Sequence, residues 1–180
     1  MRKLLYIAMA VLLLGCNSTQ TAVKNAENSK ALSKWVENKT IKVVLNSASP
    51  LAANEFASLR LLPQGSSANR ILLNGNDYFT MKGDHVNVDF PYYGTQQQST
   101  AFSFSESGVK FEGIPDSYKV EYNEKKKIYT MQMDLTNGNE TFEMTVKLFP
   151  SLKAVVHINT NRRTSITYQG VASELEASTE

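Results

Sequence analysis

Cysteine is nearly absent from this chain of 180 residues, which contains only Cys16. A single cysteine excludes an intramolecular disulfide. The two histidines, His85 and His157, have no cysteine or paired carboxylate near them at metal-ligand spacing. Each histidine falls on the polar side of an alternating segment, so we expect both to face solvent. The sequence therefore predicts no metal site and no cofactor.

A long hydrophobic run is missing as well. The longest apolar stretch, residues 4–14, is too short for the roughly twenty residues that a membrane-spanning helix needs. Arg2 and Lys3 precede this stretch, and the small residue Gly15 follows it. A basic start, a short apolar middle and a small residue at the end are typical of a secretory signal peptide, here residues 1–15.

The motif LLGC at residues 13–16 resembles the lipobox of bacterial lipoproteins. The resemblance implies that the Cys16 thiol receives a diacylglycerol and that cleavage makes Cys16 the first mature residue. Two or three acyl chains, palmitate among them, would then attach the protein stably to a membrane. The alternative is an ordinary signal peptide followed by an incidental free thiol. We favour lipidation, because a lone reactive thiol is a liability in an oxidising compartment.

Neither sign of charge dominates the mature chain. Loss of residues 1–15 removes Arg2 and Lys3 from the nineteen basic residues, leaving seventeen basic and seventeen acidic ones. Nucleic-acid binding depends on neutralising phosphates, so a neutral chain gives no reason to expect a nucleic-acid partner. The sequence also has no basic patch for anionic lipid head groups.

Composition divides the mature chain into three parts. Residues 16–27 are polar and lack periodicity, which predicts a flexible tether after the lipidated cysteine. Residues 28–172 are long enough for one domain with its own hydrophobic core. Residues 173–180 are acidic and rich in small side chains, which predicts a disordered tail.

One segment has helical periodicity. Ser29 could cap a short helix in which Leu32, Trp35 and Val36 share one face, ending near Asn38. So short a helix is unstable alone in water. We therefore expect Trp35 to pack on the domain rather than on a ligand.

After this helix the sequence alternates between apolar and polar residues. Residues 41–45 predict a short strand that ends at residues 46–50. Gly83-Asp84 separates two alternating segments and predicts a two-residue hairpin loop with glycine first. Closing that loop places Met81 beside Val86 on one face.

A second hairpin is predicted at Asn137-Gly138, since Asn-Gly is a strong two-residue turn signal. With these two residues as the loop, Met133 faces Phe142. The neighbouring pairs would be Met131 with Met144 and Tyr129 with Val146. This register keeps apolar residues opposite each other.

Neighbouring segments extend this hairpin into a meander. Residues 118–122 can pair with 129–133, and residues 154–158 can pair with 144–148. A turn at residues 161–163 leads to a last strand at 166–168. The sequence therefore predicts an all-β fold, an antiparallel meander of roughly eight to ten strands with one short N-terminal helix. Whether the strands form a barrel or a sandwich stays open.

Three blocks carry a family resemblance: FPYYG (90–94), GVKFEG (108–113) and NRRTSITYQG (161–170). In this order behind a lipobox, they resemble the bacteroidete lipoprotein family catalogued as domain of unknown function 4251. Phe90 and Tyr93 replace the leucine and phenylalanine usual in the first block, and residues 163–165 replace the usual Gln-Ser. The resemblance implies a Gram-negative envelope location and assigns no reaction, so no catalytic residue is carried over.

Five residues are candidates for ligand binding. Tyr92 and Tyr93 are adjacent on a strand and point to opposite sides, so one of them could leave the core and stack on a sugar or cover an acyl chain. Arg162 and Arg163 could grip a phosphate or carboxylate. Tyr168 could line an enclosed cavity. In the competing interpretation, the tyrosines close the end of the sheet and the arginines are solvated.

The sequence contains no catalytic motif, and enzyme activity is left uncertain but not favoured. The leading hypothesis is a non-catalytic binding or interaction module. It would either enclose a small apolar, lipid-like ligand or present a surface to an envelope partner. The alternative is a hydrolase of envelope glycans or lipids, which needs two carboxylates and no local motif. Because no acidic residue closely follows Cys16, analogy with lipoproteins of the resembled family predicts an outer-membrane anchor facing the periplasm.

Overall fold

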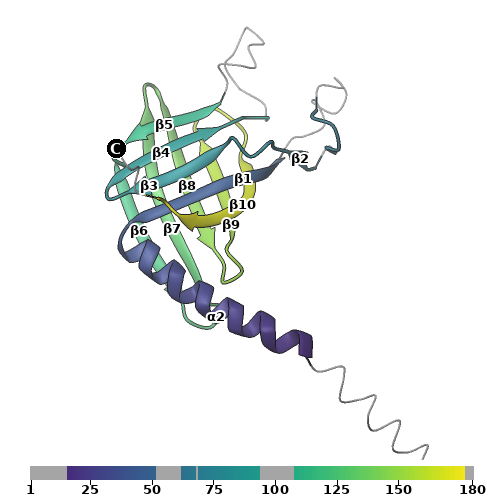
Figure 1. Ribbon diagram of the computed structural model, residues 1–180. Coiled ribbons are helices and arrows are strands. Elements are labelled where there is room, and N and C mark those ends of the chain that lie inside the picture. Colours follow the sequence, from purple (N-terminus) through teal and green to yellow (C-terminus); the bar gives the residue numbers. More distant parts are fainter. Residues whose placement is uncertain (1–15, 52–61, 68, 94–107, 177–180) are drawn as a thin grey trace, which may run out of the picture.

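The protein is seen here in a computed structural model that describes residues 16–51, 62–67, 69–93 and 108–176. Within these ranges, one antiparallel sheet curls into a half-barrel, and one helix, α2 (Cys16–Glu37), runs along its side and extends beyond it (Figure 1). The strands are β1 (Thr40–Pro50), β2 (Ile71–Leu72), β3 (Tyr78–Lys82), β4 (His85–Phe90), β5 (Val109–Gly113), β6 (Ser117–Asn123), β7 (Ile128–Asn137), β8 (Glu140–Leu148), β9 (Lys153–Thr160) and β10 (Ile166–Glu174). The predicted all-β class and strand number are confirmed, and all ten described strands belong to one continuous sheet rather than to a sandwich.

Two meanders meet in this sheet. The strand order is β5-β4-β3-β1-β10-β9-β8-β7-β6, with β2 beside β1. In the C-terminal meander, the predicted β6–β7 and β8–β9 pairings are confirmed, for example Tyr118 with Met133 and Ala154 with Leu148. Pairing of the first strand with the last, β1 with β10, joins the two halves and was not predicted.

The first predicted hairpin is confirmed. Lys82 faces His85 and Met81 faces Val86, as closure at Gly83-Asp84 requires. Gly83 has a φ of 59°, the left-handed conformation that the first loop residue of a type II′ turn needs.

The predicted register of the second hairpin is wrong by two residues. Leu135, not Met133, faces Phe142, and Asn137 faces Glu140, so the loop is Gly138-Asn139. Gly138 has a φ of 60°, and Asn139 is not left-handed, so glycine again comes first. A shift of two residues keeps every side chain on its predicted face.

The first strand is also longer than predicted. β1 continues through residues 46–50, because these residues pair with β10 as far as Pro50 opposite Ile166. The register shifts between Leu45 and Ser47, so Asn46 is an extra residue on the β1 side. Its carbonyl accepts a hydrogen bond from the Leu73 backbone instead.

The helix begins thirteen residues before the predicted start. The residues expected to form a flexible tether are helical, and Ser29 lies inside α2. Because the residues before Ser29 are helical, Ser29 is not a cap, and its hydroxyl donates to the Asn25 carbonyl at 2.8 Å. The end near Asn38 is confirmed by Lys39, whose φ of 53° stops the helix. Leu32 and Val36 are buried, and Trp35 packs on the core as expected.

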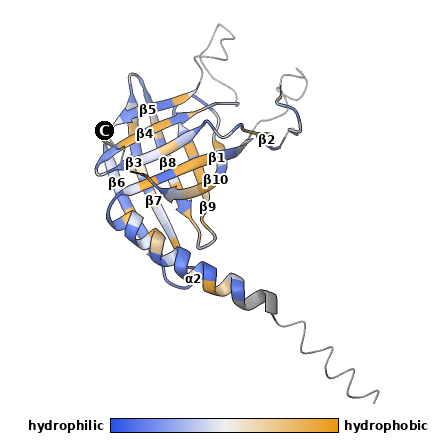
Figure 2. Cartoon of the chain, viewed as in Figure 1, coloured by the Kyte–Doolittle hydropathy of each residue, from blue (hydrophilic) through white to orange (hydrophobic). Residues whose placement is uncertain are grey.

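The core occupies the inside of the curled sheet. Strand residues alternate between buried and exposed, and hydrophobic colour alternates along the strands in Figure 2. The largest fully buried side chains include Tyr168, Phe79, Phe90 and Phe142. Burial of each such side chain contributes about 1.5–3 kcal/mol to folding.

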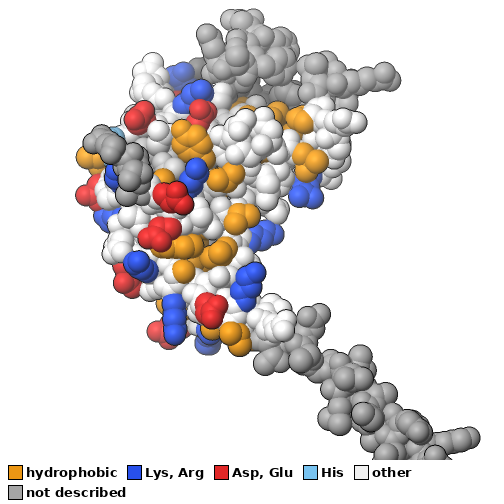
Figure 3. Space-filling view, viewed as in Figure 1, with side chains coloured by type: hydrophobic (Ala, Val, Ile, Leu, Met, Phe, Trp, Pro, Cys, Tyr) orange, Lys and Arg blue, Asp and Glu red, His pale blue; other side chains and the backbone are white. Residues whose placement is uncertain are grey.

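Acidic and basic side chains are interspersed on the face shown in Figure 3. Among the described residues, no helix is both long and apolar enough to cross a membrane. The signal peptide predicted over residues 1–15 lies outside the described residues. Of the predicted tail, Ser173 and Glu174 belong to β10, and residues 177–180 lie outside the described set.

Candidate functional site

Three of the five predicted ligand-binding residues meet at one rim of the half-barrel. Arg163 lies over the ring of Tyr92, with its guanidinium carbon 5.1 Å from the ring centre. The phenol of Tyr168 reaches the segment that carries Tyr92, donating to the Pro91 carbonyl at 2.8 Å. Arg162 is exposed in the β9–β10 turn and Tyr93 is half-buried.

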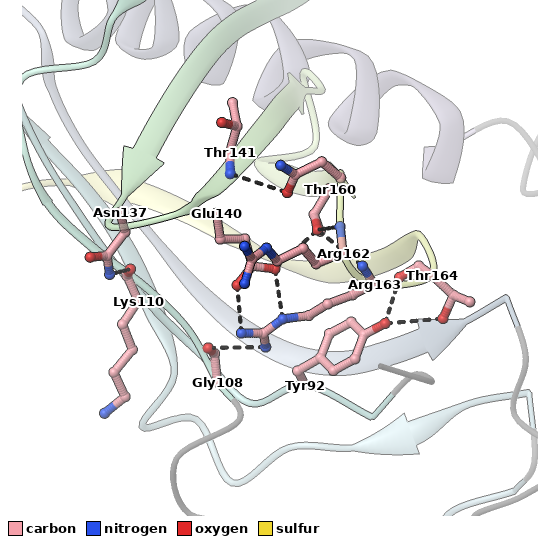
Figure 4. Close-up of polar contacts among 11 residues, drawn as sticks. Tyr92, Gly108, Lys110, Asn137, Glu140, Thr141, Thr160, Arg162, Arg163 and Thr164 are labelled. Carbon is pink, nitrogen blue, oxygen red and sulfur yellow. Dashed lines mark hydrogen bonds and ion pairs between the residues drawn. The ribbon is translucent and has the colours of Figure 1, made fainter. Parts of the chain in front are cut away.

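Arg163 is held by a carboxylate that the sequence did not identify. Its Nε and Nη2 atoms each lie 2.7 Å from an oxygen of Glu140 (Figure 4). Nη1 donates to the Gly108 carbonyl at 3.3 Å. The two side chains are 12% and 14% exposed, so this bidentate pair is largely desolvated.

The β9–β10 turn positions this arginine. The Thr160 hydroxyl accepts hydrogen bonds from the backbone N–H groups of Arg162 and Arg163, at 3.0 and 3.2 Å. The same hydroxyl lies 3.0 Å from Oε1 of Glu140, to which it donates. The turn and the start of β8 are thereby tied together at one end of the sheet.

Tyr92 completes the cluster from the other half of the sheet. Its hydroxyl lies 2.7 Å from the Thr164 carbonyl, to which it donates, and 3.0 Å from the Thr164 hydroxyl. Burial raises the pKa of the Tyr92 phenol. Burial also raises the pKa of Tyr168 well above its usual value near 10. Both phenols therefore stay protonated at physiological pH.

We call Tyr92, Glu140, Thr160, Arg163 and Thr164 the rim clasp. The clasp joins the end of β4 to the start of β8 and to the β9–β10 turn, segments from opposite halves of the sheet (Figure 4). Its donors and acceptors bind one another. The geometry is that of a structural lock on the curl of the sheet, in agreement with the interpretation in which aromatic residues close its end.

Glu140 could have been found from the meander. Antiparallel pairing of β8 with β9 places the start of β8 and the end of β9 at the same end of the sheet, where Phe142 pairs with Thr160. A carboxylate at position 140 therefore lies near the turn that carries Arg163. The position of Tyr92 was not readable in this way, because it depends on the pairing of β1 with β10.

A second group of polar side chains lies near the β3–β4 end. Burial, and then the negative charge of Asp89, raise the pKa of Asp77. Asp77 in turn contributes to the raised pKa of Tyr93, for which burial is the larger cause. Asp89 lies 3.4 Å from the Lys110 ammonium. Among the described residues, no group of three potential ligands could hold a metal ion.

The comparisons with known proteins agree on one family. The family model described as "Domain of unknown function (DUF4251)" matches residues 23–172. The chain belongs to the DUF4251 family. A crystal structure of a DUF4251 family protein from Bacteroides eggerthii DSM 20697 shares the fold, with a TM-score of 0.55 at 10% sequence identity. The match covers 83% of this chain and 89% of that one. No curated protein matches the sequence.

The family assignment confirms the resemblance carried by the three sequence blocks. The first and third blocks contribute Tyr92 and Arg163 to the rim clasp, and the second begins with Gly108, whose carbonyl accepts from Arg163. The blocks of this DUF4251 protein that lie far apart in sequence therefore meet in space. Arg163 of the third block is the residue held by Glu140.

Proposed function

We propose that this DUF4251 protein is a lipid-anchored envelope protein whose domain is a non-catalytic interaction module. The LLGC motif supports lipidation at Cys16, the first residue of α2. The absence of acidic residues close behind Cys16 supports an outer-membrane anchor that faces the periplasm. In this arrangement the helix, rather than a flexible tether, links the anchor to the domain.

The packing of the interior is the observation that carries the choice of an interaction module. Phe79, Met131, Met133, Met144 and Tyr168 are each exposed by 2% or less. Almost all of the surface of these side chains is therefore covered by other protein atoms. This packing favours a partner that binds the outer surface over an apolar ligand enclosed by the sheet.

The state of the rim clasp supports the same proposal. A site for a phosphate or carboxylate ligand needs donors that are available, whereas Arg163 already binds both oxygens of Glu140 and the Gly108 carbonyl. Its partners hold it inside the fold. The clasp therefore has a structural role, and a partner would be bound by the exposed surfaces of the domain.

Native mass spectrometry of the full chain, extracted from a Gram-negative host in mild detergent, tests the proposal. We expect a mass increased by acyl chains at Cys16, with no other small molecule retained. The Cys16→Ser variant should lose the acyl mass and leave the membrane fraction, while Ser18→Ala serves as the matched control. A co-purifying apolar ligand that survives in Cys16→Ser would favour the enclosed-ligand alternative.

A hydrolase remains the second candidate because of Asp77. Its pKa is raised by burial and by Asp89, as expected for a carboxyl group that acts as a general acid. Incubation of the full chain with peptidoglycan and with phospholipid vesicles would detect such activity. Loss of product formation in both Asp77→Asn and Asp89→Asn, with the fold retained, would support hydrolysis. No turnover by the parent chain would leave the interaction module as the better proposal.

A further inference from the structure

Strand β6 is a sheet edge without a strand partner on its outer side among the described residues. Six of its seven residues are exposed, including Val120 at 36% and Tyr122 at 46%. An exposed edge presents unpaired backbone N–H and C=O groups to another strand. The opposite edge, β5, differs, because the Asn137 side chain donates to the Lys110 carbonyl at 2.7 Å.

The β6 sequence is self-complementary about its centre. Lys119 and Glu121 precede and follow Val120 in the sequence. Their side chains lie together on the outer face of the sheet and form an ion pair at 2.7 Å. On the other face, Tyr118 and Tyr122 flank the same valine. In an antiparallel pair of identical strands with Val120 opposite its own copy, Lys119 faces Glu121 of the second copy, and Tyr118 faces Tyr122 of the second copy. Opposite charges are then paired on one face and aromatic rings on the other.

Neighbouring registers lack this complementarity. When two identical strands pair about a two-fold axis perpendicular to the sheet, the residue next to the axis lies opposite its own copy. The identity of this central residue therefore defines the register. Centring the pair on Glu121 places two glutamates opposite each other, and centring it on Lys119 places two lysines opposite each other. Like charges directly opposite are destabilising. The charges therefore select Val120 as the centre.

We propose that two copies of this chain associate through antiparallel pairing of their β6 strands, with Val120 at the two-fold axis. The pairing joins two half-barrel sheets into one continuous sheet, and backbone hydrogen bonds supply its general affinity. The four charges at positions 119 and 121 form one network across the junction and set its register. This inference goes beyond the proposed envelope role, because it holds whether or not Cys16 carries lipid.

Charge-reversed variants of the full chain in mild detergent test the register. Lys119→Glu sets glutamates opposite glutamates, and Glu121→Lys sets lysines opposite lysines, so each should dimerise roughly tenfold or more weakly than the parent. Mixing the two variants restores both attractive pairs, and the double variant restores them within one sequence. The matched control is Lys147→Glu, an exposed charge reversal in the middle of the sheet, which should leave dimerisation unchanged.

Native mass spectrometry with one variant labelled by ¹⁵N separates the heterodimer from the two homodimers. We expect monomers from each single variant and a heterodimer from the mixture. A parent chain that stays monomeric at about 100 µM, or a mixture that stays monomeric when the parent dimerises, would overturn the proposal. Dimers that are indifferent to both single substitutions would overturn it too.

Disulfide cross-linking of a second variant tests the β6–β6 contact directly and does not require tight dimerisation. Val120→Cys places a thiol opposite its own copy, within reach of a disulfide after small backbone adjustments. Oxidation should link Val120→Cys chains into dimers, while the parent chain and Lys147→Cys remain unlinked. Equal linking of all three would show that the cross-link reports Cys16 or random collision, and would overturn the proposed interface.

Discussion

Arg163 and Glu140 form a bidentate ion pair, with both N–O distances at 2.7 Å, across the rim of the half-barrel. Arg163 lies over the Tyr92 ring, and the ion pair is largely removed from solvent. Its partners come from the β9–β10 turn and the start of β8. This contact, together with Tyr92, joins the end of β4 to the opposite half of the sheet. Its loss should therefore lower the free energy of unfolding of the whole domain.

Glu140→Ala should lower the free energy of unfolding by about 3 kcal/mol, because it leaves the Arg163 charge buried without its partner. Chemical denaturation followed by circular dichroism measures this loss. Lys110→Ala is the control, since the exposed Lys110–Asp89 pair should contribute less than about 1 kcal/mol. A Glu140→Ala loss no larger than that of the control would contradict a structural role for the rim clasp.

Tyr168 should make stability fall at alkaline pH. Burial holds its pKa well above 10 in the folded state, whereas the unfolded phenol ionises near 10. Above pH 10 the native state therefore binds more protons than the unfolded state, and stability decreases with rising pH, by at most about 1.4 kcal/mol per pH unit for this group.

The Tyr168→Phe variant separates two effects of that hydroxyl. At pH 8 we expect a loss of about 1–2 kcal/mol, because the Pro91 carbonyl loses its donor. Between pH 10 and 11 the variant should lose stability less steeply than the parent. Urea unfolding at pH 8, 10 and 11 provides the comparison, and parallel curves for the two proteins would refute the assignment.

Gly170 is required by close backbone packing between β10 and β1. A Cβ atom at this position would lie 2.3 Å from the Val44 carbonyl oxygen, which belongs to the backbone and cannot turn away. Gly170→Ala should therefore cost roughly 2–4 kcal/mol or prevent folding. Gly83→Ala is the control, because its Cβ meets open space and only the left-handed φ of 59° is strained, at about 1 kcal/mol. Thermal unfolding of both variants tests this order.

Leu32 should anchor α2 to the domain. It is 1% exposed, so Leu32→Ala removes buried methyl groups and should cost about 2–5 kcal/mol. Val23 in the same helix is 56% exposed, and Val23→Ala should change the unfolding free energy by less than about 0.5 kcal/mol. Equal losses at the two positions would show that the first half of the helix also packs on the domain.

The second hairpin shows how well the register of a hairpin can be predicted from its turn residues alone. The prediction treated Asn137-Gly138 as the loop, but the glycine-first rule that worked at Gly83 also applies to Gly138-Asn139. Both loops keep Met131 and Met133 on the buried face, so the alternation could not choose between them. The observed register places Leu135 opposite Phe142, whereas a loop at Asn137-Gly138 would place Leu135 opposite Glu140.

The candidate site was predicted in part. Tyr92, Arg163 and Tyr168 meet as a group, but the prediction did not include Glu140, and Arg162 points to solvent. The alternation of residues says which face a side chain takes. It does not say which distant segment lies across from it, so the bidentate pairing was out of reach.

The alternation of apolar and polar residues was enough to predict the antiparallel strands, their order in the C-terminal half and the inward direction of the core residues. These features depend on contacts between strands that are neighbours in the chain. The pairing of β1 with β10, the closure of the curl by Arg163 and Glu140, and the dense filling of the interior depend on contacts between residues far apart. Such contacts form only when the whole sheet has curled, and folding in three dimensions was needed to reveal them.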